Sequence, residues 1–176
     1  MSLGSLDWVA ARAHLELLAP PVAGFLATWE HRESVLVAPI DPALADTVAF
    51  CERYDVPLEA SANCVIVAGR RGEVVRYAAC MILATNRADV NGIVRRRLDA
   101  RKASFAAMDE AVELTGMEYG GITPLGLPAT WPILVDDEVA DVPTAVIGSG
   151  VRRSKVALPG HLVGALPAGE VLRLRM

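Results

Sequence analysis

The stretch from Thr115 to Gly126 reads TGMEYGGITPLG and is the most informative segment of the chain. Its four glycines and one proline within twelve residues are incompatible with an ordinary helix or strand. Glycine admits positive φ and lets a ligand approach the main chain, while Pro124 stiffens the loop. Successive free N–H groups in such a loop suit a carbonyl, carboxylate or phosphate oxygen. The residues by themselves fit either a binding loop or a plain structural turn.

Hydrophobic periodicity and turn residues predict the elements on both sides of this loop. A helix is expected over 108–114, closed by Gly116, because glycine is the preferred residue just past a helix end. Further helices are expected over 6–18, ended by Pro20-Pro21, over 22–29, over 41–54 with Asp41 as the N-cap, and over 86–98. Strands are expected over 34–40, 64–68, 74–83, 133–135, 145–148 and 154–158, with the turn 69–72 joining a hairpin.

Hairpins alternate with helices along the chain, without the strict strand–helix–strand repetition of a doubly wound sheet. The pattern predicts a mixed α/β (α+β) fold, with a curved, largely antiparallel mixed sheet and helices packed around it. We expect one compact domain over residues 1–176, with an N-terminal helical extension over 1–30 and a core over about 35–162.

The overall charge argues against a general nucleic-acid binder, because the formal net charge is −4 at pH 7. A protein that recognises only the end of an RNA needs no more than a local basic patch. The candidates for such a patch are Arg95, Arg96, Arg97, Arg101 and Lys102. The alternative is that these residues form the solvated face and end of a helix.

Three cysteines, an odd number without a CxxC motif, predict neither a disulfide framework nor a zinc site. We expect a cytoplasmic protein with no metal and no cofactor. A signal peptide and an apolar run long enough to span a bilayer are both missing from the sequence, so no membrane association is expected.

The glycine-rich loop resembles the Thr-Gly-x-x-x-Gly-Gly-x-Ser/Thr-Pro-x-Gly signature of the YbaK-like family. That family includes free-standing aminoacyl-tRNA deacylases and the editing insertion of bacterial prolyl-tRNA synthetase. The similarity continues in the strand 132–136, which ends in Asp136, and in the glycine/serine-rich turn 147–153 with its basic end. Upstream, the break at 56–58 and the strand 65–68 fit the same family.

The resemblance implies a pocket between the loop 120–126 and the turn 148–150, which in the family holds the aminoacyl ester at the tRNA terminus. The substrate-binding residues it implies are Gly120, Gly121, Ile122, Thr123, Pro124, Gly126, Gly148, Ser149 and Gly150. Thr123 is also a catalytic candidate, with a hydroxyl suited to orienting the substrate.

This chain departs from the family at a lysine that many members carry just before the strand that begins here at Cys64. Asn63 occupies that place, and a neutral amide can orient a carbonyl but cannot neutralise an anion. Lys155 is a candidate replacement cation, and its alternative interpretation is an exposed surface lysine. Asn63, Thr123 and Lys155 are therefore the catalytic candidates.

Other reactive side chains have more ordinary interpretations. Cys64 enters an apolar strand, where cysteine usually acts as a small buried hydrophobe. His14, His31 and His161 are scattered along the chain, which argues against a His-based triad or metal site. Asp136 could orient a water or cap the turn that follows it, and the cap is the favoured interpretation.

Two functions follow as hypotheses. The first is a trans-acting editing hydrolase that deacylates mischarged tRNA, with the aminoacylated 3′ end of tRNA as its partner and an aminoacyl-tRNA synthetase as a possible second one. Loop N–H groups would stabilise the oxyanion while water attacks. The alternative is a non-hydrolytic YbaK-like protein that binds an aminoacylated tRNA end, a nucleotide or a small metabolite, as the loss of the lysine and the acidic charge suggest.

Overall fold

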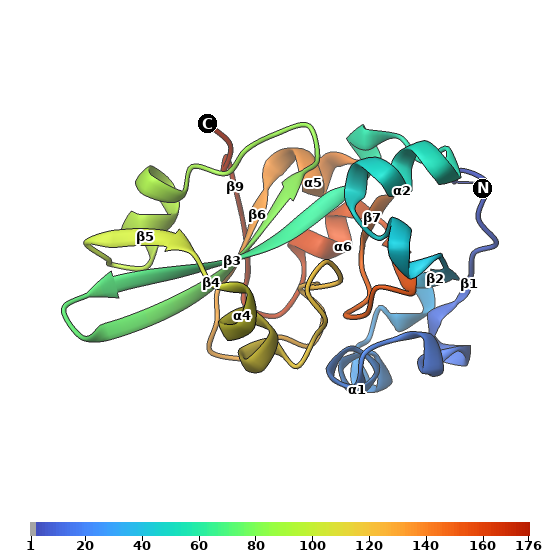
Figure 1. The fold of residues 1–176 in the computed structure, drawn as a ribbon, viewed down its shortest axis with the longest axis horizontal. Coiled ribbons are helices and arrows are strands. Elements are labelled where there is room, and N and C mark those ends of the chain that lie inside the picture. Colours follow the sequence, from blue (N-terminus) through green and yellow to red (C-terminus); the bar gives the residue numbers. More distant parts are fainter. Residues whose placement is uncertain (1–2) are drawn as a thin grey trace.

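Nine strands form two sheets that lie side by side in the computed structural model, which describes residues 3–176 (Figure 1). The four-stranded sheet has the order β1 (Val9–Ala10), β2 (Leu36–Pro39), β8 (Ser154–Leu158), β7 (Ala145–Gly148), and all its pairs are antiparallel. The five-stranded sheet has the order β5 (Lys102–Phe105), β3 (Ala62–Arg71), β4 (Val74–Leu83), β6 (Ile133–Asp136), β9 (Gly169–Leu172). In it, β4–β6 and β6–β9 are parallel. The mixed α/β class is confirmed, and the strands are divided between two sheets.

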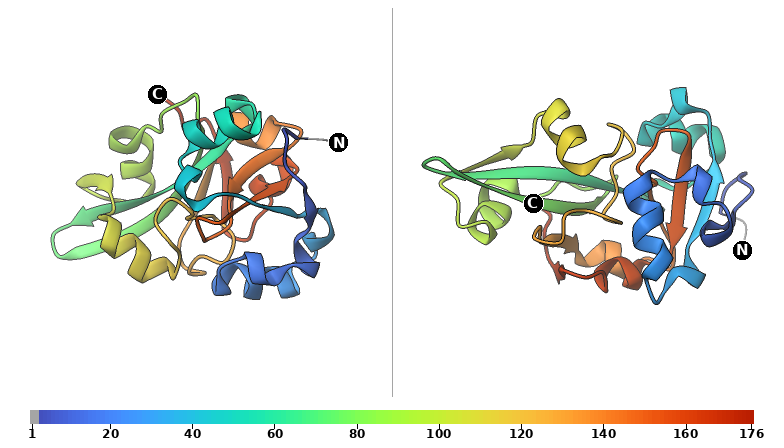
Figure 2. Two further views of the ribbon diagram at one scale, coloured as in Figure 1. Left: turned by 45° about the vertical axis from the view of Figure 1, so that its right-hand side comes forward. Right: turned by 90° about the horizontal axis from the view of Figure 1, so that it is seen from below.

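The helices are short, and they cover the faces of the sheets. They are α1 (Pro20–Thr28), α2 (Thr47–Tyr54), α3 (Arg95–Arg97), α4 (Met108–Thr115), α5 (Asp137–Asp141) and α6 (Gly160–Gly164), with a π-helical turn at Val90–Val94 and 3₁₀ turns at Ala11–Ala13, Leu15–Leu17, Arg32–Ser34, Pro42–Leu44 and Leu58–Ala60. The β3–β4 hairpin projects from one end of the molecule, with α4 on one side of it and α3 on the other (Figure 2). No helix within residues 3–176 is long and apolar enough to cross a membrane.

Three apolar clusters form the core. The largest joins the two sheets, α1 and α4 through residues such as Leu26, Met81, Ala111 and Val156. A second lies under α3 and includes Val67 and Leu98, and a third lies under α2 and includes Phe50 and Ala157. Because β8 contributes Val156 to one cluster and Ala157 to another, both faces of this strand are covered.

The helix predicted over 6–18 is wrong. Val9 and Ala10 instead pair with Val37 and Leu36 of β2, and two 3₁₀ turns follow. The hydrogen bond of 2.9 Å from Ala11 N to Val35 O continues this pairing, so tertiary hydrogen bonding overrides the local helical pattern. Of the predicted extension over 1–30, residues 1–2 lie outside the described part of the chain.

Pro20-Pro21 begins a helix rather than ending one. The helix expected over 22–29 is confirmed as α1, with both prolines in its first turn. Proline fits there because the first N–H groups of a helix have no intrahelical acceptor, so nothing is lost by its missing N–H.

Two predicted helices are interrupted. Asp41 accepts a hydrogen bond of 2.9 Å from Ala43 N as expected, but it caps a 3₁₀ turn, and extended backbone at Asp46 separates this turn from α2. The helix expected over 86–98 starts only at Val90, because Asp89 caps the turn through the N–H groups of Gly92 and Ile93. The strands β5 and β9 were not predicted.

Candidate functional site

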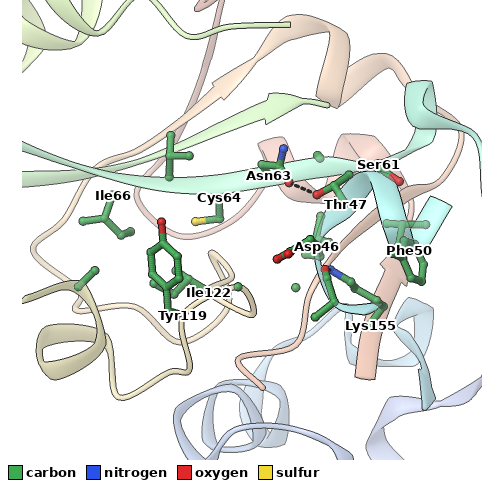
Figure 3. Close-up of a pocket in the computed structure, with 18 of the residues that line it drawn as sticks. Asp46, Thr47, Phe50, Ser61, Asn63, Cys64, Ile66, Tyr119, Ile122 and Lys155 are labelled. Atoms are coloured by element: carbon green, nitrogen blue, oxygen red, sulfur yellow. Dashed lines mark hydrogen bonds between the residues drawn. The ribbon is translucent and has the colours of Figure 1, made fainter. Parts of the chain in front are cut away.

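A cavity of about 430 Å³ lies between α2, the start of β3, the ends of β7 and β8, and the glycine-rich loop (Figure 3). Its walls are mostly apolar, with Ile66, Ile122 and Ile147 among them, and its polar groups come from a few side chains. A concave, largely apolar site with a small number of placed polar groups is typical of small-ligand pockets. The lining residues are Ala45, Asp46, Thr47, Phe50, Ser61, Ala62, Asn63, Cys64, Val65, Ile66, Phe105, Ala106, Ala111, Tyr119, Gly120, Ile122, Val146, Ile147, Gly148 and Lys155.

The glycine-rich loop and the 148–150 turn touch each other at this cavity. Gly150 N donates a hydrogen bond of 2.7 Å to Gly121 O. A Cβ at Gly148 would lie 2.4 Å from Gly121 O, so only glycine permits this approach. Gly120, Ile122 and Gly148 line the cavity. Within residues 3–176, the N–H groups of Gly120 and Ile122 make no hydrogen bond to another residue, which leaves them available to a ligand oxygen.

The other residues of the loop proposed to bind substrate lie outside the cavity wall. Gly126 has φ +86°, and a Cβ there would lie 2.3 Å from Pro21 O in α1. Pro124 and Thr123 are buried beside it, and Thr123 Oγ1 is a buried oxygen without a hydrogen-bond partner among the described residues. Gly121 is enclosed too, since a Cβ there would lie 2.7 Å from the carbonyl of Val151.

The turn residues after Gly148, which are Ser149 and Gly150, also lie outside the cavity wall. A Cβ at Gly150 would lie 2.4 Å from Ala19 Cβ, so this glycine is packed against the start of α1. Ser149 is fully buried, and its Oγ lies 2.7 Å from Ser154 Oγ and 3.0 Å from Val151 O. These contacts give Ser149 a structural reason to be polar, independent of any ligand.

Asn63 borders the cavity at the start of β3 and is held by α2. Thr47 Oγ1 donates a hydrogen bond of 2.6 Å to Asn63 Oδ1, which leaves the amide NH₂ of Asn63 as its remaining donor. Figure 3 shows this pair beside the cavity. A positive charge is therefore absent from the position where the sequence comparison expected one.

Lys155 is buried, with 8% of its surface exposed, so the alternative interpretation as an exposed surface lysine is wrong. It lines the cavity from the start of β8. Its Nζ donates a hydrogen bond of 2.9 Å to Ala45 O and lies 5.2 Å from the ring centre of Phe50. Since an ammonium has three N–H donors, two remain for a ligand.

Burial lowers the pKa of Lys155 to about 8, because desolvation disfavours the charged form. The nearby Arg152 acts in the same direction, whereas Asp46 opposes it. The ammonium form still predominates at pH 7, so Lys155 places a positive charge in a largely apolar wall. It is the only lysine or arginine among the described residues that line the cavity.

Sequence reasoning missed the residues at the cavity mouth. Arg152 Nη1 lies 3.7 Å from Asp46 Oδ1 and donates to Tyr119 O at 3.3 Å, so it links α2 to the glycine-rich loop. Tyr119 and Phe105 border the cavity with 52% and 63% of their surface exposed. The position of Tyr119 within the glycine-rich loop was a signal that could have found it, whereas Phe105 lies before α4 and had no such signal in the sequence.

The surroundings of the remaining reactive candidates do not favour a catalytic role. Cys64 lines the cavity, but burial raises the pKa of its thiol well above the usual range, so the nucleophilic thiolate is disfavoured. Asp136 is fully buried and accepts hydrogen bonds from Glu138 N, at 3.2 Å, and from Leu174 N, at 2.8 Å. It therefore caps α5 and anchors the C-terminal segment. None of His14, His31 and His161 lies among the described residues of the cavity wall.

The family model of the aminoacyl-tRNA editing domain matches residues 41–163, which include the glycine-rich loop, the turn and Lys155. The chain belongs to the aminoacyl-tRNA editing domain family. This editing domain is 28% identical over 115 residues to the "Proline--tRNA ligase" of Listeria monocytogenes serotype 4a, and 28% identical over 107 residues to that of Listeria welshimeri. The first alignment covers 65% of this chain and 19% of the ligase, and the second covers 60% and 17%. The chain therefore spans about a fifth of the length of the curated relatives that it matches.

The fold of the editing domain also recurs in solved structures. One, described as a candidate trans-editing enzyme for prolyl tRNA synthetase, has a TM-score of 0.75 at 20% identity, with 90% of this chain and 96% of that chain covered. A scaffold used for computational epitope grafting has a TM-score of 0.75 at 19% identity, with 90% and 97% covered. At these identities, the likeness establishes the fold alone.

Proposed function

We propose that this editing domain is a trans-acting hydrolase that cleaves the ester between a wrongly attached amino acid and its tRNA. The observation that carries the proposal is the buried ammonium of Lys155 in a cavity that Gly120 and Ile122 also line, two residues whose N–H groups make no hydrogen bond within residues 3–176. An ammonium and unpaired amide donors are the groups that stabilise a developing oxyanion. The family membership supports an aminoacyl-tRNA end as the ligand.

In the proposed reaction, a water molecule attacks the ester carbonyl carbon. The negative charge that develops on the carbonyl oxygen is stabilised by Lys155 Nζ and by the N–H groups of Gly120 or Ile122. The ester C–O bond then breaks, the ribose oxygen takes a proton, and the free amino acid and an uncharged tRNA are released. No protein nucleophile takes part, in agreement with the protonated state that burial favours at Cys64. The substrate's neighbouring ribose hydroxyl helps to orient the water.

Asn63 and Thr123 have supporting parts in this proposal. Asn63 keeps its NH₂ group free to orient a polar atom of the substrate, because its Oδ1 is occupied by Thr47. Thr123 is fully buried and does not line the cavity, so we assign it to the shape of the loop rather than to contact with the ester. Gly148 gives the backbone approach that brings the loop to the cavity.

The aromatic side chains at the mouth fit the nucleoside that carries the ester. Phe105 and Tyr119 are both more than half exposed, and both border the cavity. With the ester inside the cavity, the terminal base of the tRNA would lie outside it, against these rings. Stacking of a base on an aromatic ring contributes about 1–3 kcal/mol and does not require a hydrogen-bond pattern. The apolar inner wall would receive the amino-acid side chain.

The names of the relatives suggest which tRNA to test first. The curated relatives are proline–tRNA ligases, and one fold neighbour is described as acting for prolyl tRNA synthetase. We therefore propose mischarged tRNA of the proline system as the substrate and the matching synthetase as the source of the error. Editing is useful there because a synthetase pocket discriminates small apolar side chains by only about 1–3 kcal/mol per methylene.

The test is a deacylation assay with the purified protein on a panel of tRNAs charged with correct and incorrect amino acids, beginning with tRNA for proline. Faster release from at least one mischarged tRNA than from the correctly charged one supports the proposal. Lys155→Met, purified in parallel, controls for a contaminating hydrolase. Equal release with and without protein across the panel would refute hydrolysis.

One observation favours a second candidate, a protein that binds the aminoacylated end without hydrolysing it. Asn63 is neutral and already bonded to Thr47, so the family's usual positive charge is missing at the start of β3. Binding of charged tRNA in preference to uncharged tRNA, together with no release of the amino acid, would favour this candidate.

A further inference from the structure

Positive charge is concentrated in one short segment of this acidic protein. Residues 95–102 read RRRLDARK and contain five of the 17 lysines and arginines of the chain, against one carboxylate. The segment runs from α3 into β5, on the hairpin end of the five-stranded sheet (Figure 1). We call Arg95, Arg96, Arg101 and Lys102 the α3–β5 cation cluster.

The protein does not neutralise this cluster. Asp99 is already shared by Arg71, at 2.7 Å, and Arg76, at 3.6 Å. Arg97 is excluded from the cluster because it pairs with Glu170 at 2.6 Å.

Within the cluster, Arg95 Nε donates only to the carbonyl of Asn91. Arg96, Arg101 and Lys102 are exposed, and their side chains make no hydrogen bond or ion pair with any of residues 3–176. The cluster therefore faces solvent with its charge uncompensated.

Helix capping accounts for only part of the cluster. Cations near a helix C-terminus are favourable by about 0.3–1 kcal/mol, and the effect falls off within the last turn. This explains Arg95 and Arg96 in α3. Arg101 and Lys102 lie beyond the helix, where the helix dipole gives no reason for a positive charge, and Lys102 opens β5.

The β5 end of the cluster lies on the edge strand that reaches the cavity mouth. Lys102 is the first residue of β5, and Phe105, which borders the cavity, is the last. Three residues of a strand span about 10 Å at roughly 3.3 Å per residue. A nucleic acid whose end enters the cavity would therefore carry phosphates past this edge of the sheet. Local cations that contact phosphates position a nucleic acid without reading its sequence.

We propose that the α3–β5 cation cluster binds the phosphodiester backbone of the tRNA whose charged end enters the cavity. The proposal rests on the proposed function for the identity of the ligand. It assigns a docking surface outside the cavity, and it reconciles the net charge of −4 with an RNA partner, because a local patch replaces an overall basic surface.

The experiment measures binding of uncharged tRNA by fluorescence anisotropy over a series of KCl concentrations, so that it does not depend on hydrolysis. The test variant is Arg101→Gln/Lys102→Gln. The control is Arg12→Gln/Arg32→Gln, which removes an equal number of positive charges from exposed positions elsewhere on the protein. Thermal melting checks that both variants are folded.

We expect the test variant to bind tRNA more weakly than the wild type and to reduce the slope of log affinity against log salt by about 1 for each lost cation. The control should keep the wild-type affinity and slope. Deacylation of an aminoacylated trinucleotide, which lacks the stem, should be unchanged in the test variant while that of full-length tRNA slows.

Equal affinities and slopes for the test variant and the wild type would overturn the proposal, and so would a wild type that does not bind tRNA. If the wild type binds tRNA through the cluster but releases no amino acid, the docking surface is supported and the proposed hydrolase activity is refuted. Equally strong loss in the control variant would attribute the effect to net charge rather than to this surface, and would also overturn it.

Discussion

Gly120 and Gly126 have the same φ but different neighbours. Both have φ +86°, and they lie at the two ends of the GGITPLG segment. A Cβ at Gly120 would lie 2.2 Å from Arg152 Nη1, the far end of a flexible side chain at the cavity mouth. A Cβ at Gly126 would lie 2.3 Å from the Pro21 carbonyl oxygen, in the backbone of α1.

One glycine-rich loop therefore serves two purposes. Its first half, with Gly120 and Ile122, forms cavity wall, and its second half, with Pro124 and Gly126, fastens the loop to α1. The motif is continuous in sequence, but the boundary between the halves is set by what packs behind each residue. Substitutions in the two halves should therefore separate stability from activity.

The largest effect on stability is expected for Gly126→Ala. Positive φ costs a residue with a Cβ roughly 1–2 kcal/mol, and the clash with α1 adds about 1–3 kcal/mol of overpacking. The free energy of unfolding should fall by about 2–5 kcal/mol in urea denaturation, while activity per folded molecule stays near wild type. Gly72→Ala, with φ +60° and no atom within 4 Å of its Cβ, is the control for φ strain and should lose about 1–2 kcal/mol.

Gly120→Ala is the counterpart of Gly126→Ala in the other half of the loop. It should lower the free energy of unfolding no more than Gly72→Ala does, but it should reduce activity because the new Cβ displaces Arg152. Comparable destabilisation at Gly120 and Gly126 would contradict the division of the loop.

A loss of about one to two decades in the rate of deacylation is expected for Lys155→Met. The charge-assisted contact of an ammonium with an oxyanion contributes roughly 1.5–3 kcal/mol when it is made in the transition state. Lys155→Met keeps most of the apolar stem, so folding should be retained, and single-turnover kinetics on mischarged tRNA measures the effect. A variant as active as wild type would remove Lys155 from the proposed chemistry.

The pH dependence of deacylation should report the same lysine. Lys155 has a pKa lowered to about 8, so its positive charge is present below this pH and is lost as pH rises through it. After subtraction of the spontaneous hydrolysis of the ester, the protein-dependent rate should fall above about pH 8. Lys155→Arg should flatten this fall, because a guanidinium stays protonated. If the wild type and Lys155→Arg show the same fall in rate above pH 8, a group other than Lys155 controls the pH dependence.

The same pKa has a consequence for stability with a definite sign. Because the folded-state pKa of Lys155 lies below the value of 10.5 for a lysine in water, the unfolded chain binds more protons between about pH 8 and 10.5. The contribution of Lys155 to the free energy of unfolding therefore rises with pH over this window. Lys155→Met should lack this contribution, as urea denaturation at pH 8 and pH 10 can show.

Roughly fivefold to tenfold increases in KM are expected for Phe105→Ala and for Tyr119→Ala, with kcat little changed. Loss of a stacked base costs about 1–3 kcal/mol, and the exposure of both rings favours the lower end. Tyr119→Phe keeps the ring and is the control that should behave as wild type. If the two alanine variants lower kcat and leave KM unchanged, the aromatic residues do not hold the nucleoside.

The smallest effect is expected for Asn63→Lys in the wild-type background, because Lys155 already supplies a positive charge to the cavity. In the Lys155→Met background the same substitution should restore part of the lost rate. A gain of a decade or more in the wild-type background would contradict this account and show that the position before β3 is where charge matters most.

Local sequence signals were sufficient for elements whose hydrogen bonds are local. The β3–β4 hairpin forms where two apolar runs flank Gly72, and α4 ends at Gly116, whose φ is +67°. The cap by Asp136 was also predictable, because an acidic side chain at a strand end meets the N–H groups of the turn that follows. The segment 6–18 was mispredicted because its partners, Leu36 and Val37, lie more than 20 residues away.

The sequence predicted a loop after Gly116 and a turn at 148–150, because clustered glycine and proline residues disfavour both helix and strand. Tertiary packing determines which of these residues line the cavity and makes Lys155 a buried residue. Strand alternation places Lys155 opposite Val156, but it cannot say which face is exposed. All five residues of β8 are buried, because the main core packs on one face of the strand and α2 covers the other.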